Sequence, residues 1–142
     1  MSNVTKARPI LLIEDNPMDL DLTMRAFAKK KLENPIQVAR DGEEALDYLK
    51  KWEVGEQVPI VILLDLNMPK VSGLEVLKEL KTHPDFKKIP VVVLTTSSES
   101  TDIESAYQLG ANSYIVKPVN FEKFVEVTDQ IDVYWRIINK LA

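Results

Sequence analysis

The residue with the clearest chemical potential is Asp65, which stands where a run of apolar residues stops. That run, Ile60–Leu64, has five apolar residues, three of them β-branched. Such a run is typical of a strand buried on both faces inside a parallel sheet. The alternative, that Asp65 only caps the next helix, is weakened because helical spacing resumes only near Gly73. The pattern therefore predicts a carboxylate at the end of a central strand, where open α/β sheets bind ligands.

The other strands are predicted from four further short apolar runs, which span Pro9–Ile13, Ile36–Ala39, Ile89–Leu94 and Asn112–Val116. Segments with helical spacing follow them: about Pro17–Lys31, Glu43–Trp52, Gly73–Thr82, Glu99–Leu109 and Asn120–Leu141. Strand and helix thus alternate five times with short connections. This alternation predicts an α/β doubly wound domain with a five-stranded parallel sheet and helices on both faces.

Polar residues close four of these strands, and a parallel sheet would bring them to one edge. The first strand ends in Glu14 and Asp15, the third in Asp65, the fourth in Thr95 and the fifth in Lys117. Three clustered carboxylates repel one another unless a cation lies among them. An all-oxygen site suits Mg²⁺, which also favours phosphate oxygens. The three carboxylates would balance Mg²⁺ plus the lysine, so an added phosphoryl group would make the occupied site negative.

This combination points to phosphoryl transfer with a carboxylate as nucleophile, which forms an aspartyl phosphate. The Thr95 hydroxyl can donate a hydrogen bond to a phosphoryl oxygen. Charge alone does not decide which carboxylate attacks: Asp65 stands alone on its strand, whereas Glu14 and Asp15 are paired as a metal-binding edge would be. Because the sequence has no glycine-rich phosphate loop and no Walker motif, a nucleotide is not the expected direct donor.

Composition excludes several other classes of function. The 142 residues are about one domain's worth, with a net charge of −4 and no basic run, so a nucleic-acid partner is not expected. No cysteine is present, which excludes disulfides, thiol nucleophiles and cysteine-bound metals. Neither a signal peptide nor a membrane-spanning run is recognisable, so we expect a cytoplasmic protein with no membrane partner.

Four motifs together resemble the receiver domains of two-component response regulators. They are the acidic pair at Glu14, the segment DLNMPKVSG at Asp65–Gly73, VVVLTT with Thr95, and YIVKP at Tyr114–Pro118. Their order and spacing match the family over about residues 8–130. The resemblance implies a flavodoxin-like sheet in the order 2-1-3-4-5. Residues 131–142 would then be a C-terminal helix extension, with no output domain.

The same resemblance implies roles for the acidic residues. Asp65 would accept a phosphoryl group from a histidine kinase. Mg²⁺ would be held by Asp15 and Asp65, by the Asn67 backbone carbonyl, and by Glu14 through water. The chain departs from the commonest pattern at Glu14, where Asp is more usual. The longer side chain of Glu14 would shift the position of the metal or of its bound waters.

The resemblance also implies a set of residues that respond to the phosphoryl group. Lys117 would contact the phosphoryl oxygens. Thr95 and Tyr114 would form a switch pair, in which the threonine hydroxyl moves to the phosphoryl group and the tyrosine turns inward. The peptide bond between Lys117 and Pro118 would be cis.

Two segments indicate a narrower group within this family, and the last predicted helix indicates a homodimer. EDNPMDLDL after the first strand and LTTSSESTDI after the fourth are similar to small stand-alone regulators of phytochrome-type histidine kinases in bacteria. The last predicted helix carries apolar residues on more than one face, among them Tyr134, Trp135 and Ile137. Such patches often mark protein contacts, and two-fold pairs are the commonest assembly. The alternative is that the extra turns of this helix cover the domain's own core. The resemblance to phytochrome-associated regulators favours a symmetric homodimer through this helix, which is what we expect.

Two other classes of protein fit this sequence less well than a phosphoacceptor does. A phosphatase-like enzyme would need a general acid two residues after its nucleophilic aspartate, but Asn67 has no titratable proton there. A flavodoxin-like cofactor carrier would need a phosphate loop rich in Ser, Thr and Gly after the first strand. The loop here reads EDNPMD, and its acidic residues would repel a phosphate.

Overall fold

A computed structural model of the chain describes residues 8–30, 34–117 and 126. The described part contains a five-stranded sheet in which all neighbours are parallel, in the order β2-β1-β3-β4-β5. The strands are β1 (Ile10–Ile13), β2 (Ile36–Ala39), β3 (Val61–Leu64), β4 (Val91–Thr95) and β5 (Ser113–Val116). The predicted fold class and the order 2-1-3-4-5 are confirmed.

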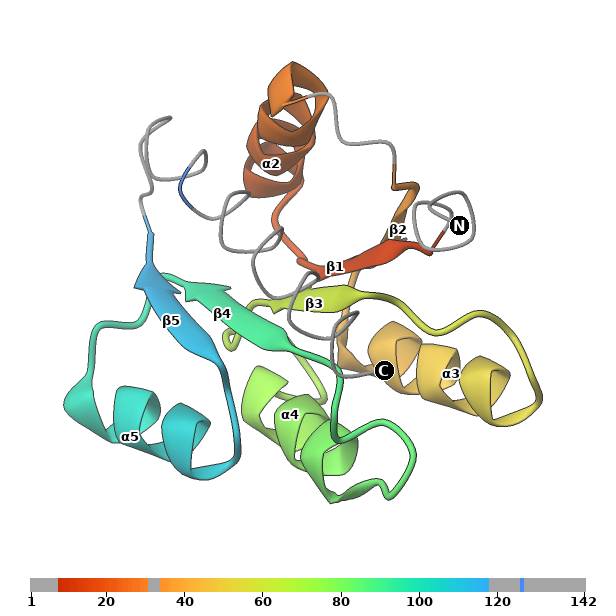
Figure 1. Cartoon of the computed structure of the whole chain (residues 1–142). Coiled ribbons are helices and arrows are strands. Elements are labelled where there is room, and N and C mark those ends of the chain that lie inside the picture. The colour runs from red at the N-terminus through yellow and green to blue at the C-terminus, as the bar shows by residue number, and fades with distance from the viewer. Residues whose placement is uncertain (1–7, 31–33, 118–125, 127–142) are drawn as a thin grey trace.

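Helices cover both faces of the sheet (Figure 1). They are α2 (Pro17–Lys30), α3 (Gly42–Glu53), α4 (Gly73–Thr82) and α5 (Ser100–Gln108). In the described part, α2 lies on one face and the other three helices lie on the opposite face. Their ends, and those of the strands, fall within two residues of the sequence predictions wherever the chain is described.

Side-chain caps explain where three of the described helices begin. The Asn16 side-chain oxygen accepts hydrogen bonds from the backbone N–H groups of Met18 and Asp19, at 2.9 and 3.2 Å. With Pro17 as the first helical residue, this is the predicted start of α2. Asp41 and Ser72 cap α3 and α4 in the same way. Local sequence therefore explains where α2, α3 and α4 begin, whereas α5 starts at Ser100 without a side-chain cap from Glu99.

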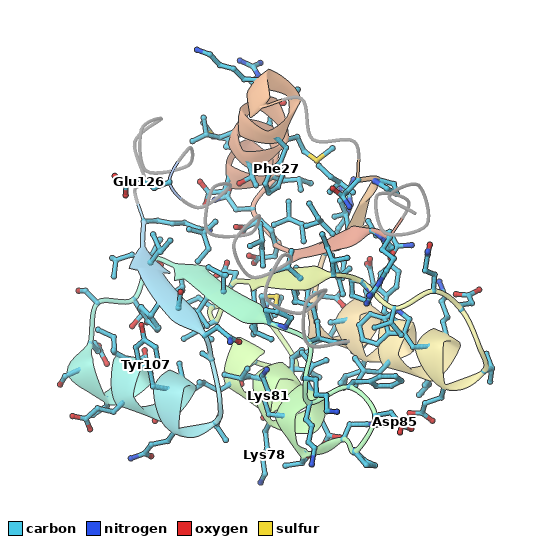
Figure 2. All side chains as sticks on the ribbon, in the orientation of Figure 1. Phe27, Lys78, Lys81, Asp85, Tyr107 and Glu126 are labelled. Atoms are coloured by element: carbon cyan, nitrogen blue, oxygen red, sulfur yellow. The ribbon has the colours of Figure 1, made fainter. Side chains whose placement is uncertain are left out.

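The sheet separates two apolar clusters, because alternate residues of each buried strand point to opposite faces. On the α2 face, Ile10 and Leu12 of β1 pack in a cluster with Phe27. Figure 2 shows Phe27 on α2. Leu11 and Ile13 belong to the larger cluster on the other face, together with residues of α3 and α4. The β1 side chains are at most 1% exposed, which explains their unbroken apolar run.

The strand order places a crevice at the carboxyl ends of β1 and β3, where the direction of winding reverses. At this edge the loop after β3 folds back tightly, and the Gly73 N–H donates to the Leu66 carbonyl at 3.0 Å. A Cβ on Gly73 would lie 2.4 Å from the Asp65 carbonyl oxygen, closer than real Cβ atoms come. The missing side chain thus lets α4 start directly against the end of the central strand.

Several predictions lie outside the described residues. These are the helix over residues 120–141, the homodimer through it, the extension at residues 131–142 and the cis peptide before Pro118. Among the helices that the structure does describe, none combines the length and apolar character needed to cross a membrane.

Candidate functional site

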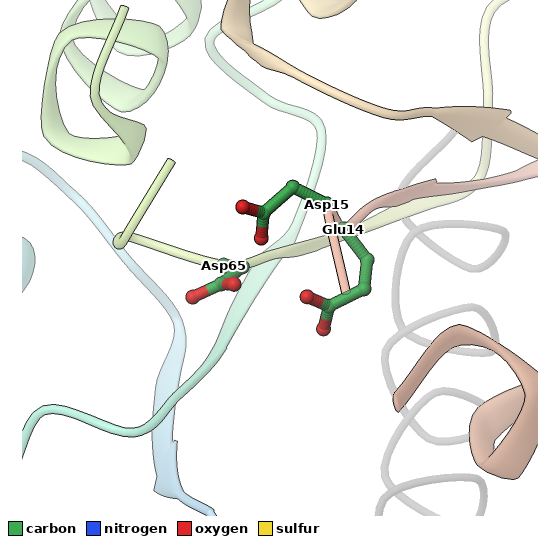
Figure 3. Close-up of side chains that lie close together, drawn as sticks. All are labelled: Glu14, Asp15 and Asp65. Atoms are coloured by element: carbon green, nitrogen blue, oxygen red, sulfur yellow. The ribbon is translucent and has the colours of Figure 1, made fainter. Parts of the chain in front are cut away.

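Three carboxylates meet at the crevice between β1 and β3 (Figure 3). Glu14 and Asp15 follow β1 directly, Asp65 follows β3, and each offers an oxygen within 4.8 Å of the other two. Glu14 and Asp65 are only 2% and 6% exposed, whereas Asp15 is exposed to solvent. The parallel sheet therefore brings together the acidic residues that the sequence places at separate strand ends.

Burial, and after it the crowding of negative charges, raises the pKa values of two carboxyl groups at this site. Burial is the main cause that raises the pKa of Glu14 to about 7, and the neighbouring Asp65 adds to the rise although Lys117 opposes it. The pKa of Asp15 is also raised, first by burial and then by the charge of Asp65. A cation among these oxygens would relieve the repulsion that disfavours their ionised forms.

Lys117 is a buried cation at the end of β5 that faces the acidic group. Its Nζ donates to Glu14 Oε1 at 2.5 Å and to Asp19 Oδ2 at 3.0 Å, and lies 3.7 Å from Asp65 Oδ2. Burial alone would lower the pKa of Lys117, but hydrogen bonds to Glu14 and Asp19, together with the charges of Asp65 and Glu14, outweigh that effect and raise it. The lysine is therefore held as an ammonium beside Asp65.

Asp19 is a fourth carboxylate of this site, and sequence reasoning missed it. It lies in the first turn of α2, not at a strand end, and its side chain is 33% exposed. Among the described residues the site thus holds four carboxylates, so Mg²⁺ and the lysine together would leave these groups one charge negative, not neutral. An acidic residue in the first turn of the helix after β1 was the available signal, because that turn begins at the same sheet edge.

Asn67 connects Asp65 to the end of β4. Its backbone N–H donates to Asp65 Oδ1 at 3.1 Å, and its side-chain amide donates to the hydroxyls of Thr95 and Thr96 at 3.2 and 2.9 Å. Thr95 is fully buried, whereas Thr96 is exposed and was not predicted as part of the site. Asn67 therefore supplies donors in the position where a phosphatase-like enzyme would place an acid.

Tyr114 lies one strand further from the acidic group. Its hydroxyl donates to the Ser97 carbonyl, at 2.8 Å, in the loop that follows β4. Burial is the main cause that raises the pKa of Tyr114, so the phenol remains protonated near neutral pH. Thr95 and Tyr114 are thus each engaged by a hydrogen bond, and Tyr114 belongs to the β4–β5 side of the site.

A solvent-open hollow of about 490 Å³ gives access to these groups. Asp15, Asp65, Asn67 and Lys117 line it, together with the first residues of α2. The hollow has room for a hydrated cation and a phosphoryl group beside Asp65. Carboxylate oxygens are hard ligands, and a cation that keeps several waters, as Mg²⁺ does, fits a group that offers one oxygen from each of three carboxylates.

A five-stranded parallel sheet of this order, with an acidic group and a buried lysine at its carboxyl edge, defines the receiver class of flavodoxin-like domains. The family model of the response regulator receiver domain matches residues 10–129. The chain belongs to this family, as the sequence resemblance predicted. Its members are signalling domains and not conventional enzymes.

Two regulators from different organisms are similar to this chain in sequence. The chain is 45% identical over 127 residues to a probable methanogenesis regulatory protein, FilR2, of Methanothrix harundinacea, covering 89% of this chain and 82% of the relative. It is 38% identical over 128 residues to the response regulator Rcp1 of Synechocystis, covering 89% and 87% of the two chains.

Solved structures include regulators from phytochrome systems. Phosphorylated RcpA, a cyanobacterial phytochrome response regulator, superposes with a TM-score of 0.79 and 40% identity over 91% of this chain and 94% of its own. The bacteriophytochrome response regulator AtBRR gives 0.75 and 48%, with 91% and 95% covered. The Mn²⁺-bound form of Rcp1 gives 0.77 and 37%, with 90% and 94% covered. The predicted relation to phytochrome-associated regulators is therefore confirmed.

Proposed function

We propose that this receiver domain accepts a phosphoryl group on Asp65 from a histidine kinase, in a Mg²⁺-dependent reaction. The main support for the proposal is the position of Asp65 in the site. Its carboxylate is nearly buried, opens into a solvent-accessible hollow, and lies 3.7 Å from the Lys117 ammonium. It is also the candidate that stands alone on its strand, while Glu14 and Asp15 are adjacent at the end of β1.

The reaction is a transfer between two nucleophiles. An Asp65 carboxylate oxygen forms a bond to phosphorus, and the bond from phosphorus to the kinase imidazole nitrogen breaks, with its electron pair leaving on that nitrogen. The Lys117 ammonium faces the added negative charge, and Asn67 and Thr95 offer an amide and a hydroxyl beside it. The chain therefore contributes position and charge, and no general acid is needed.

For the metal, we propose Asp15, Asp65 and the Asn67 carbonyl as ligands, with Glu14 acting through water. When bound, Mg²⁺ would neutralise carboxylate and phosphoryl oxygens. Three findings support this set: the mutual approach of the carboxylates, the raised pKa of Glu14 and Asp15, and a Mn²⁺-bound structure of the related Rcp1.

The proposed partner is a histidine kinase, and the phytochrome type is the specific candidate. RcpA and AtBRR, which are named as regulators in phytochrome systems, are 40% and 48% identical to this chain. FilR2 is similarly close, so identity alone does not select the sensor. Uptake of one phosphoryl group from acetyl phosphate, a small-molecule donor, tests the acceptor function without the kinase, and a panel of phosphorylated kinases then tests the partner.

The switch is expected to rearrange Thr95 and Tyr114. A phosphoryl group on Asp65 would draw the Thr95 hydroxyl away from Asn67, and Tyr114 would give up the Ser97 carbonyl to fill the space. Crystal structures with and without beryllofluoride, a phosphoryl mimic, measure both contacts. Unchanged side-chain positions at Thr95 and Tyr114 in the mimic-bound protein would rule the switch out.

We further propose that residues 131–142 extend the domain and that the chain forms a homodimer through its C-terminal region. The support is the apolar pattern that includes Tyr134 and Ile137. Sedimentation is expected to give a dimer for the wild-type protein and a folded monomer when both residues are changed to Glu. A wild-type monomer at high micromolar concentration, phosphorylated or not, would contradict this arrangement.

A further inference from the structure

Asp19 makes a contact that the proposed transfer reaction does not use. Its Oδ2 accepts a hydrogen bond from Lys117 Nζ at 3.0 Å, and this ion pair joins the first turn of α2 to the end of β5. Asp19 does not belong to the group of three carboxylates whose oxygens approach one another. It therefore acts on the site through Lys117 and is not a candidate metal ligand.

The backbone of Asp19 is fixed on both sides. Its N–H donates to the Asn16 cap at 3.2 Å, and its carbonyl accepts from the hydroxyl of Thr23, a residue that is only 2% exposed. The side chain thus reaches Lys117 from an anchored helical turn. The contact is part of a built arrangement and not the chance meeting of two mobile surface groups.

We propose that Asp19 is a positioning residue that holds the Lys117 ammonium off Asp65 in the unphosphorylated protein and releases it when a phosphoryl group arrives. The inference rests on the proposed phosphoacceptor function. Two carboxylates, Glu14 and Asp19, are within hydrogen-bond distance of Lys117 Nζ, whereas Asp65 lies beyond it at 3.7 Å. A phosphoryl oxygen bound at Asp65 would therefore compete with Glu14 and Asp19 for the Lys117 ammonium.

Burial decides which of the two contacts gives way. The Glu14 side chain is 2% exposed, so losing Lys117 would leave a nearly buried carboxylate without its cation. The Asp19 side chain is 33% exposed, and water can replace the lysine there at lower cost. Binding of a phosphoryl group thus competes mainly with Asp19, and the phosphorylated protein would carry an unpaired carboxylate at the start of α2.

The alternative is that Asp19 contributes only to stability. In that case its removal lowers the free energy of unfolding but leaves the affinity for a phosphoryl mimic unchanged. Under the positioning role, Asp19→Asn weakens the competitor for Lys117 and removes a negative charge that repels the incoming group. Both effects strengthen binding of the mimic, so affinity and stability together distinguish the two roles.

The experiment compares Asp19→Asn with Asp21→Asn, which makes the same charge change on the same helix. Asp21 pairs with Arg25 at 3.0 Å, is 62% exposed, and does not line the hollow. Calorimetric titration with beryllofluoride in saturating Mg²⁺ is expected to give about three- to tenfold tighter binding for Asp19→Asn, as loss of a partly exposed ion-pair competitor predicts. Asp21→Asn is expected to bind as wild type does.

A double-mutant cycle between Asp19→Asn and Lys117→Met, measured by urea unfolding in EDTA, checks the contact itself. A non-zero coupling is expected, because the two side chains touch. Zero coupling, or coupling with an unchanged mimic affinity in Asp19→Asn, would overturn the positioning role. Equal tightening in Asp21→Asn would overturn it as well, since net charge would then be the cause. Failure of the wild-type protein to bind the mimic would instead refute the phosphoacceptor function, and the positioning role with it.

Discussion

Replacing Asp65 by Asn is expected to reduce phosphoryl uptake from acetyl phosphate by at least about a hundredfold, because the amide cannot attack phosphorus. The side chains are nearly isosteric, and the change removes one of the crowded negative charges at the site. Without metal, the free energy of unfolding should therefore fall by no more than about 1 kcal/mol, and a rise is also consistent with the proposal. Gel electrophoresis that retards phosphorylated protein measures the rate, and urea unfolding measures the stability.

Asp47→Asn is the matched control, since Asp47 is an exposed aspartate on α3 that does not line the hollow. This variant is expected to take up the phosphoryl group at the wild-type rate. If the Asp65 variant also did so, the phosphoacceptor would be another residue, and the adjacent pair Glu14 and Asp15 would be examined next.

Removal of divalent metal with EDTA is expected to stop phosphoryl uptake, and Mg²⁺ in excess should restore it. Asp15→Ala should raise the Mg²⁺ concentration needed for half-maximal uptake by at least about tenfold, because the variant lacks a proposed ligand oxygen. Mg²⁺ should also stabilise the wild-type fold by about 2.7 kcal/mol at a concentration one hundred times its dissociation constant. Thermal unfolding measured against Mg²⁺ concentration gives a readout that does not depend on the reaction.

Asp47→Ala serves as the control for this series and should need no more Mg²⁺ than the wild type. Uptake that persists in EDTA would show that the three carboxylates do not act through a metal. A shift of the Mg²⁺ requirement as large in Asp47→Ala as in Asp15→Ala would attribute the effect to net charge and not to the ligand.

The fold could be predicted from sequence because strand and helix signals are local and strong here. The run Ile60–Leu64 is apolar throughout since β3 is covered on both faces, and Asn16 and Pro17 mark a helix start by their own chemistry. Periodicity was less informative for the exposed side of α2. Met24 is 37% exposed there, whereas Phe27, three residues further along the helix, is buried.

The site residues that lie at strand ends could be predicted from the sequence. The contacts that depend on side-chain length and on the path of a loop could not. Parallel strands bring Glu14, Asp65 and Lys117 to one edge whatever the details of packing. The contact from Asp19 depends on how α2 leaves β1 and on the length of the lysine side chain, which the strand pattern does not encode. The two hydrogen bonds of the Asn67 amide depend in the same way on the path of the loop after β3.

The central claim is that Asp65 of the wild-type protein carries the phosphoryl group. The direct measurement is intact mass after incubation with acetyl phosphate and Mg²⁺, followed by proteolysis and mapping of the modified peptide. One phosphoryl group per chain, located on the peptide that contains Asp65 and absent when EDTA is present, is the predicted result. No gain in mass, or a phosphoryl group located on any other residue, would contradict it.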